Sequence, residues 1–278
     1  RADELEERDA IIGPNQSLIP ILPTENITNR WESKYFNNQE QHRIKLDADL
    51  LWLIGYFMGD GSLGYRKQTV KEHEYKYLRL RFHDETLETL YEVKRILETR
   101  FNAKINIYKD SRGSNGYTLQ TLNRKACNFF NKLFGVGSKT YSLKMPRFIY
   151  KSGINNITSF LAGLLDSDGY VTKDGKAVYS SASREFASEV AVLSSLIGCG
   201  GGITIDKHTD GATIIRKSAN NEVVKLITSK IINNNRKQKL INSINKQHRS
   251  QKCIPLQKEI LENFLEIPTK AAEWLRLE

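Results

Sequence analysis

A regular pattern of hydrophobic and polar positions begins at Asp47. The apolar run Leu50–Met58 predicts a buried helix that Asp47 caps at its start and that the pair Asp60-Gly61 ends. In the segment 77–82 every second residue is apolar and the others are Tyr or Arg, which is the period of a strand with one face on the core. The patterned part of the chain therefore begins with a buried helix and continues into extended segments.

The following segments alternate between helical and strand periods. Apolar residues at helical spacing predict helices at 84–100 and 124–134. Period-two alternation predicts strands at 103–109 and 117–122, joined by a turn around Ser111–Gly116.

The same order then repeats in the second half of the chain. The segment 157–167 predicts another apolar helix, which ends at Asp168-Gly169. Further on we expect strands near 170–173 and 177–181, a helix at 184–197, strands at 202–207 and 212–216, and helices at 219–232 and 235–246. Each half reads αββαββα, so we expect an α+β fold of two pseudo-symmetric subdomains.

The pattern divides the chain into four parts. Prolines and polar residues interrupt the first segment, which we interpret as an extension or linker with a short helix at 2–9. The last segment predicts helices near 256–266 and 268–277. The parts are an N-terminal extension at 1–46, a first subdomain at 47–150, a second subdomain at 151–255 and a C-terminal helical extension at 256–278.

The ends of the two apolar helices resemble each other. The segments Leu53–Gly61 (LIGYFMGDG) and Leu161–Gly169 (LAGLLDSDG) share the opening Leu, the third-position Gly, the eighth-position Asp and the closing Gly. A mid-helix glycine such as Gly55 or Gly163 costs about 1 kcal/mol relative to Ala. That cost is reasonable where two helix backbones approach closely, so we expect these helices to pack against each other.

The shared aspartates, Asp60 and Asp168, end their helices, where the negative end of the helix dipole disfavours a carboxylate. A divalent cation would reverse this preference. Packed helices would bring both carboxylates together, and paired oxygen ligands suit Mg²⁺. Such a site supports metal-assisted hydrolysis of a phosphodiester. The alternative is that Asp-Gly is only a helix stop followed by a turn, which the repeat disfavours.

The charge of the chain adds a candidate partner. The net charge is +10, yet residues 1–46 hold six Lys or Arg against eight Asp or Glu. The basic excess therefore belongs to the part with periodic structure. A basic folded domain favours DNA or RNA as a partner, and a generic basic surface is the alternative.

The cysteines bear on the compartment. Cys127, Cys199 and Cys253 are odd in number and far apart, which argues against a disulfide framework. We expect an intracellular protein in a reducing compartment, without a signal peptide or membrane partner, since the longest apolar run is too short to span a bilayer.

At its two motifs the chain resembles the LAGLIDADG homing endonuclease family in its single-chain, two-motif form. The segment LAGLLDSDG differs from the family name at two of nine letters, and the resemblance covers about residues 47–250. It implies that the motif helices form the interface between the subdomains and that the two sheets form a DNA-binding saddle. It also implies a monomeric endonuclease that hydrolyses both strands of a long double-stranded DNA target with Mg²⁺ and gives 3′ overhangs. Mn²⁺ or Ca²⁺ would substitute for Mg²⁺ in binding.

The resemblance assigns roles to individual residues. Asp60 and Asp168 would bind the catalytic metal, with the backbone carbonyls of Gly59 and Ser167 as further ligands. Asp166 aligns with Met58 in the first motif, so we expect that Asp166 is not the essential ligand.

A basic residue near the catalytic centre of each half is also typical of the family. Lys144 precedes Pro146, and Lys252 precedes Pro255, so we nominate both lysines as catalytic. Lys239 and Lys246 are rivals for the second position, and ordinary surface lysines are the alternative.

Strand faces and loops supply the DNA-binding candidates, since side chains on the concave face of such a saddle read bases or contact phosphates. The strand candidates are Tyr77, Arg79, Arg81, Lys104, Asn106 and Tyr108. The loop candidates are Arg66, Lys67, Lys109, Arg112 and Lys173, and those of the second half are Lys207, His208, Arg216 and Lys217. For each one, a merely solvated charged side chain is the alternative.

Other functions remain open for this fold. An intron RNA maturase or a non-catalytic DNA-binding regulator would be expected to have lost a motif acid, and both acids are present. An intein context is a further alternative. The chain as given has no Cys or Ser at residue 1 and no His-Asn at its end, so we do not expect it to splice by itself.

Overall fold

The computed structural model describes most of the two repeated halves. The described residues are 28–31, 42–70, 73–110, 116–137, 143–173, 176–199, 201–205, 212–216 and 221–245. The side chains of 28–31, 42–43, 70, 201–205, 212–216, 221–222 and 244–245 are not described.

The first half begins with a buried helix and continues with two hairpins and two further helices. Its elements are α1 (Ala48–Asp60), β3 (Gly61–Val70), β4 (His73–Asp84), α2 (Leu87–Phe101), β5 (Asn106–Lys109), β6 (Tyr117–Thr121) and α3 (Arg124–Phe134). The side chain of Asp47 accepts a hydrogen bond from the backbone N–H of Leu50 over 3.2 Å, which confirms it as the cap of α1.

The second half repeats this order after a short 3₁₀ helix, η2 (Arg147–Lys151). Its elements are α4 (Gly153–Asp166), β7 (Gly169–Val171), β8 (Ala177–Ser181), α5 (Arg184–Leu196), β9 (Gly201–Ile205), β10 (Ala212–Arg216), α6 (Asn221–Lys230) and α7 (Asn234–Asn245). The predicted αββαββα order is present in both halves, and α7 follows the second.

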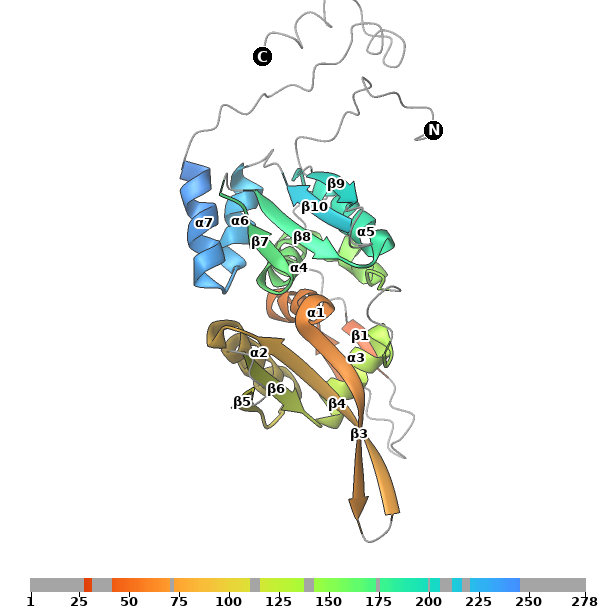
Figure 1. Ribbon diagram of the computed structural model, residues 1–278. Helices are drawn as coiled ribbons and strands as arrows, with labels where there is room; N and C mark the ends of the chain where they lie inside the picture. Colours follow the sequence, from red (N-terminus) through yellow and green to blue (C-terminus); the bar gives the residue numbers. More distant parts are fainter. Residues whose placement is uncertain are drawn as a thin grey trace, which may run out of the picture.

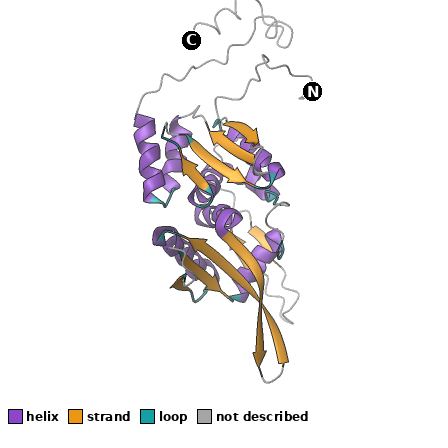
Figure 2. Cartoon of the chain, in the orientation of Figure 1, coloured by secondary structure: helices purple, strands orange, loops and turns teal. Residues whose placement is uncertain are grey.

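The two sheets have the same topology. Their strand orders are β3-β4-β6-β5 and β7-β8-β10-β9, with every neighbouring pair antiparallel. Figure 1 shows the two sheets at opposite ends of the folded part, with α1 and α4 side by side between them. The fold is therefore α+β with two pseudo-symmetric subdomains packed through their first helices, and Figure 2 shows helices and strands interleaved in each half.

The core of the first half confirms the period-two reading of β4. Leu80 and Phe82 are fully buried under α2 and α3, and Phe82 packs edge-on against Phe57 of α1 and Phe130 of α3. Because successive strand residues point to opposite faces, Arg79 and Arg81 project from the face away from these helices.

The hairpin of β3 and β4 is longer than the sequence pattern indicated. β4 pairs with β6 only over Leu80–Asp84, whereas its pairing with β3 continues from Phe82 out to His73. The outer part of the hairpin therefore projects from the sheet (Figure 1). In the second half the corresponding turn closes early, at the hydrogen bond from Thr172 N to the carbonyl oxygen of Lys176.

The flanking segments need one correction. We expected 1–46 to be irregular, but β1 (Thr28–Trp31) and β2 (His42–Lys45) pair as a two-stranded antiparallel sheet. Backbone pairing over four positions is what the local composition failed to indicate. The helices expected at 2–9, 256–266 and 268–277 lie outside the described residues. Among the described helices none is long and apolar enough to cross a membrane.

Candidate active site

The two motif helices touch through their glycines. A Cβ atom built on Gly163 would lie 2.0 Å from the carbonyl oxygen of Trp52, and one on Gly55 would lie 2.2 Å from that of Phe160. Both distances are far below van der Waals contact, so no other residue fits at either position without movement of the backbone. This confirms the expectation that the glycines permit close approach of the helices.

The helix ends bring the two motif aspartates together. Asp60 is the last residue of α1, and Asp168 follows α4 after the capping residue Ser167. A Cβ on Gly59 would lie 2.1 Å from Ser167 Oγ and 3.1 Å from Asp168 Oδ2. The carboxylate of Asp168 therefore lies against the residue that precedes Asp60.

The charges of the Asp60 and Asp168 carboxylates both act on the hydroxyl of Tyr179 in β8. Burial raises the pKa of its hydroxyl well above the usual value, and the negative charges of Asp168 and Asp60 raise the pKa further. A single buried hydroxyl can respond to both charges only if they lie near it. The motif acids thus form one electronegative centre.

This donor set fits a hard divalent cation, because it offers carboxylate and backbone carbonyl oxygens. In the described part of the chain, no three His, Cys, Asp or Glu side chains gather in a way that could hold a metal ion. Asp60 and Asp168 would accordingly need carbonyl, water or substrate oxygens to complete a coordination shell. A shell that includes phosphate oxygens is what Mg²⁺ usually adopts.

Asp166 has a different role from the other two acids. It is completely buried, and its Oδ2 accepts hydrogen bonds from Trp52 Nε1 over 2.9 Å and from the backbone N–H of Ile232 over 2.8 Å. Its Oδ1 accepts from the N–H of Asn233 over 3.0 Å. Burial raises the pKa of this carboxyl to about 6, while the backbone donors act in the opposite direction. Asp166 ties α4 to α1 and to the turn between α6 and α7. That it is not the essential ligand stays a prediction.

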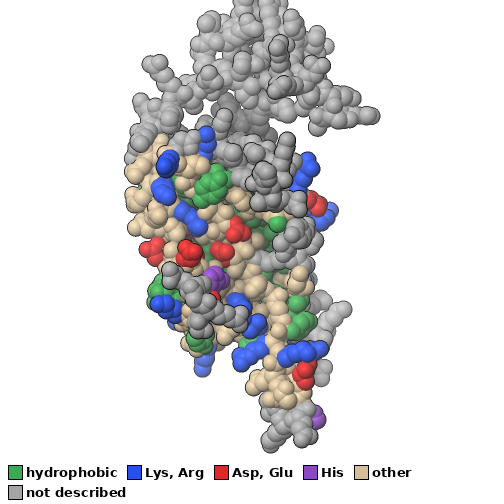
Figure 3. All heavy atoms as spheres, viewed as in Figure 1, with side chains coloured by type: hydrophobic (Ala, Val, Ile, Leu, Met, Phe, Trp, Pro, Cys, Tyr) green, Lys and Arg blue, Asp and Glu red, His purple; other side chains and the backbone are tan. Residues whose placement is uncertain are grey.

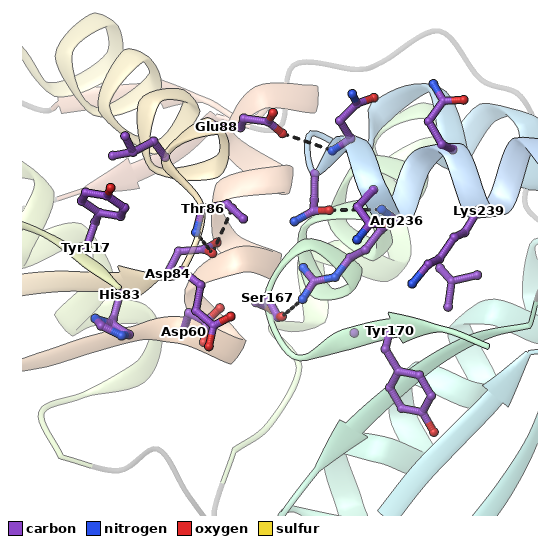
Figure 4. A pocket seen from close by; sticks show the side chains of 18 residues that line it. Asp60, His83, Asp84, Thr86, Glu88, Tyr117, Ser167, Tyr170, Arg236 and Lys239 are labelled. Carbon is purple, nitrogen blue, oxygen red and sulfur yellow. Dashed lines mark hydrogen bonds between the residues drawn. The ribbon is translucent and has the colours of Figure 1, made fainter. Parts of the chain in front are cut away.

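A cleft of about 1230 Å³ opens beside the motif acids, between the two halves. It is lined by the ends of β4 and α1, the start of α2, β7 and the start of α7. Figure 4 shows Asp60, His83, Asp84, Ser167, Arg236 and Lys239 around it. Figure 3 shows several Asp and Glu side chains near the middle of the described part, with Lys and Arg side chains above and below them. The surface thus offers carboxylates at its centre and cations around them.

Asp84 in this cleft is structural as well as acidic. Its Oδ2 accepts a 2.5 Å hydrogen bond from the hydroxyl of Tyr56 and another from Thr89, and its Oδ1 accepts from the N–H of Thr86 over 2.8 Å. Burial first, and then the charge of Asp84, raise the pKa of Tyr56 far above its usual value. The network fixes the junction of β4 and α2 against the motif helix α1.

Comparisons with known proteins agree with the geometry of this centre. Two protein-family models match: the PI-PfuI endonuclease subdomain over residues 38–134 and the LAGLIDADG-like domain over residues 155–245. The chain belongs to the LAGLIDADG homing endonuclease family. The two matches fall on the two halves, so this LAGLIDADG protein carries both units in one chain.

Individual relatives of this LAGLIDADG chain are distant. It is 26% identical over 147 residues to a glutamine–fructose-6-phosphate aminotransferase of Methanocaldococcus jannaschii, a match over 52% of the chain and 12% of that protein. It is 26% identical over 186 residues to an iron-sulfur cluster assembly SufBD family protein of Mycobacterium leprae, over 66% of the chain and 19% of that protein. The matches thus span only a small part of either curated relative.

A solved structure shares the fold. Mesophilic variants of the homing endonuclease I-DmoI superpose with a TM-score of 0.51 and 17% identity, over 67% of this chain and 98% of theirs. At this identity the likeness shows the fold alone.

The LAGLIDADG strand face carries several of the predicted DNA contacts. In β4, Tyr77, Arg79 and Arg81 share one face, and Arg66 pairs across from Tyr77 in β3. Partial burial lowers the pKa of the Arg79 guanidinium, and the nearby charges of Arg81 and Arg66 lower it further. The buried Nε of Arg81 has no hydrogen-bond partner in the described structure. The structure thus brings three arginines together on a face that α2 and α3 do not cover.

Other predicted contacts are placed differently from the expectation. Arg66, Lys67 and Lys109 were expected in loops, but the first two lie in β3, because that hairpin is longer than the turn residues suggested. Lys109 is the last residue of β5, at the end of the strand expected at 103–109. By strand alternation, Lys67 lies on the hairpin face opposite Arg66, and it forms a 3.2 Å ion pair with Glu74.

The remaining candidates of the first half are exposed at its outer edge. Lys104 precedes the edge strand β5, and within that strand the amide nitrogen of Asn106 lies 3.3 Å from the hydroxyl of Tyr108.

In the second half, Lys173 is exposed in the turn after β7. Arg112, Lys207, His208 and Lys217 lie outside the described residues, as does the side chain of Arg216 in β10.

The catalytic role of Lys144 and Lys252 stays a prediction. Lys144 Nζ forms a 3.0 Å ion pair with Glu185, and both side chains are exposed. The segment around Lys144 is fixed to the start of α5, where Ser183 Oγ donates to the carbonyl oxygen of Leu143 and the N–H of Met145 donates to Glu189. Lys252 and its rival Lys246 lie outside the described residues, and the other rival, Lys239, lines the cleft.

Sequence reasoning missed Tyr179, the Tyr56–Asp84 network and Arg236, whose guanidinium donates to the carbonyl oxygens of Asp166 and Ser167. These residues lie outside the motifs and meet them only through tertiary packing. An Arg in the first turn of a polar helix carries no local signal of such a role.

Proposed function

We propose that the chain is a divalent-metal-dependent endonuclease that cuts both strands of a long double-stranded DNA target and leaves 3′ overhangs. The observation that carries the proposal is the convergence of Asp60 and Asp168 at the ends of two helices packed through Gly55 and Gly163. Two carboxylates held this close by backbone contact repel each other, and a cation would relieve that repulsion.

In this proposal Asp60 and Asp168 hold the metal, together with the carbonyl oxygens of Gly59 and Ser167. A bound Mg²⁺, or Mn²⁺ in its place, supplies activation of water and neutralises charge that develops on the phosphate. The carbonyl oxygen of Ser167 already accepts a 3.0 Å hydrogen bond from Arg236, so that oxygen would share its lone pairs between the two cations. Lys144 and Lys252 are proposed as the basic residues near the scissile phosphates.

The strand faces would hold the DNA. Arg66, Arg79 and Arg81 present adjacent positive charges on this face, which suits phosphates and the edges of guanines. The ten-residue strand β3 spans roughly 33 Å at about 3.3 Å per residue, which is long enough to follow the major groove for several base pairs. The exposed Tyr77 and Tyr75 stack on the same face, with ring centroids 6.3 Å apart, and extend this surface outward.

The proposal extends to context. The two curated relatives have unrelated names, and the matched segment is 12% of one and 19% of the other. A module that recurs inside unrelated proteins is typical of a mobile insertion, so an intein or intron origin is proposed. With both halves in one chain we propose a monomer, in a reducing compartment where the side chains of Cys127 and Cys199 stay as thiols.

The experiment first selects cleavable sites from a randomised DNA library with Mg²⁺ and sequences the cut ends. Asp60→Asn and Asp168→Asn are then compared with wild type on a selected site. Each carboxamide removes a negative metal ligand at nearly constant size, so cleavage should be abolished while binding in a gel-shift assay persists. Asp49→Asn at the opposite end of α1 is the matched control and should cut normally. Normal cutting by both motif variants would contradict the proposal.

A further inference from the structure

A single side chain of α7 holds the C-terminal end of the second motif helix. Arg236 Nη2 donates to the carbonyl oxygen of Ser167 over 3.0 Å (Figure 4), and Nη1 donates to that of Asp166. The last carbonyl groups of a helix have no partner within it, and these two directly precede Asp168. The guanidinium therefore satisfies the backbone at the point from which the carboxylate of Asp168 projects.

The geometry of arginine makes this contact directional. Its planar guanidinium presents two donors in a fixed arrangement, so two carbonyl groups bound to it cannot turn independently. The positive charge also lies at the negative end of the α4 dipole, beside a centre that carries two carboxylates. Arg236 thus opposes both the loosening of the helix end and the repulsion between the acids.

Arg236 is itself fixed on both sides. Its backbone N–H donates to Asn233 Oδ1 over 3.1 Å, and the N–H groups of Ile232 and Asn233 donate to the buried carboxylate of Asp166. The N–H of Asn234 donates to Glu88 of α2 over 3.2 Å. The turn before α7 is therefore bonded both to the second motif helix and to the first half of the protein.

We infer that Arg236 is a positioning residue for Asp168, which orients this carboxylate through the backbone of Asp166 and Ser167. The inference rests on the proposed endonuclease function. The two pseudo-symmetric halves would face the two antiparallel strands of the DNA, so each acid would serve chiefly one strand. Displacement of a reacting group by 1 Å can cost about 100-fold in rate. Loss of Arg236 should consequently slow the cleavage of one strand more than the other.

The first test measures single-turnover cleavage of each end-labelled strand with Mg²⁺. Arg236→Gln should slow one strand at least about 10-fold, so that a nicked intermediate accumulates, and Arg236→Lys should recover part of the rate because it restores one donor. Lys237→Gln is the matched control, since the neighbouring Lys237 donates to the carbonyl oxygen of Ser229 on α6. Equal slowing of both strands, or no slowing, would overturn the inference.

The second test does not depend on cleavage. Amide hydrogen exchange at Ser167, Asp168 and Gly169 should be faster in Arg236→Gln than in wild type, and unchanged in Lys237→Gln. Unchanged exchange in Arg236→Gln would overturn the inference, whether or not the protein cuts DNA. Faster exchange combined with a wild-type protein that cuts no DNA would support the anchoring of Asp168 and overturn the proposed function.

Discussion

Substitution of Gly163 by Ala tests the contact between the motif helices. The added Cβ would lie 2.0 Å from the carbonyl oxygen of Trp52 and 2.8 Å from the backbone nitrogen of Tyr56, where ordinary contact begins at 3.4 Å. Both neighbours are backbone atoms, so no side-chain rotation relieves the overlap. The helices must separate by roughly 1 Å or more, the scale on which overpacked cores are strained.

The expected magnitude follows from two opposing effects. Overpacking costs about 1–3 kcal/mol, and the higher helix propensity of Ala offsets about 1 kcal/mol of this. The net loss of unfolding free energy is then up to about 2 kcal/mol, which corresponds to a fall of up to roughly 8 °C in the melting temperature. The effect on cleavage should be larger, up to about 100-fold, because Asp168 moves relative to Asp60 while the strand faces that hold DNA remain intact.

The assay combines thermal unfolding with single-turnover cleavage of a selected target. Gly64→Ala in β3 is the matched control for the melting measurement, since a Cβ there meets nothing within 4 Å and should leave the melting temperature unchanged or slightly raised. If Gly163→Ala melted and cut like wild type, the reasoning that the glycines set the spacing of the acids would be refuted.

Two further predictions concern residues around this centre. Asp166→Asn should lower the unfolding free energy by about 1–3 kcal/mol, measured by urea denaturation, because its amide NH₂ must face a donor among Trp52, Ile232 and Asn233. Asp49→Asn removes only partly exposed ion pairs with Arg95 and Arg100, and an equal loss of stability in that variant would contradict this. Arg81→Ala should weaken DNA binding, and the slope of log K against log salt concentration should fall by about 1 in magnitude. Lys94→Ala lies on α2, which packs on the other face of the sheet, and should leave the slope unchanged. Identical slopes for wild type and both variants would argue against a phosphate contact at Arg81.

The sequence by itself determined the elements whose signals are local. The apolar helices, the mid-helix glycines and the alternation of Leu78, Leu80 and Phe82 with Arg79 and Arg81 each lie within about ten residues. Their repetition in the same order predicted both the pseudo-symmetry and the meeting of Asp60 with Asp168. Helical and strand periods are properties of short segments, so they can be read without knowledge of the fold.

Only the tertiary structure decided what lies around that pair. The ion pair of Lys67 with Glu74 depends on the register of a hairpin that turn residues alone did not define. Asp166 and Arg236 are separated by 70 positions along the chain, and no short-range pattern reports that one bonds the turn before α7 while the other holds the backbone before Asp168. Such contacts arise from the packing of whole elements, whose free energy is shared among many residues, and therefore they appear only once α4, α6 and α7 are placed in space.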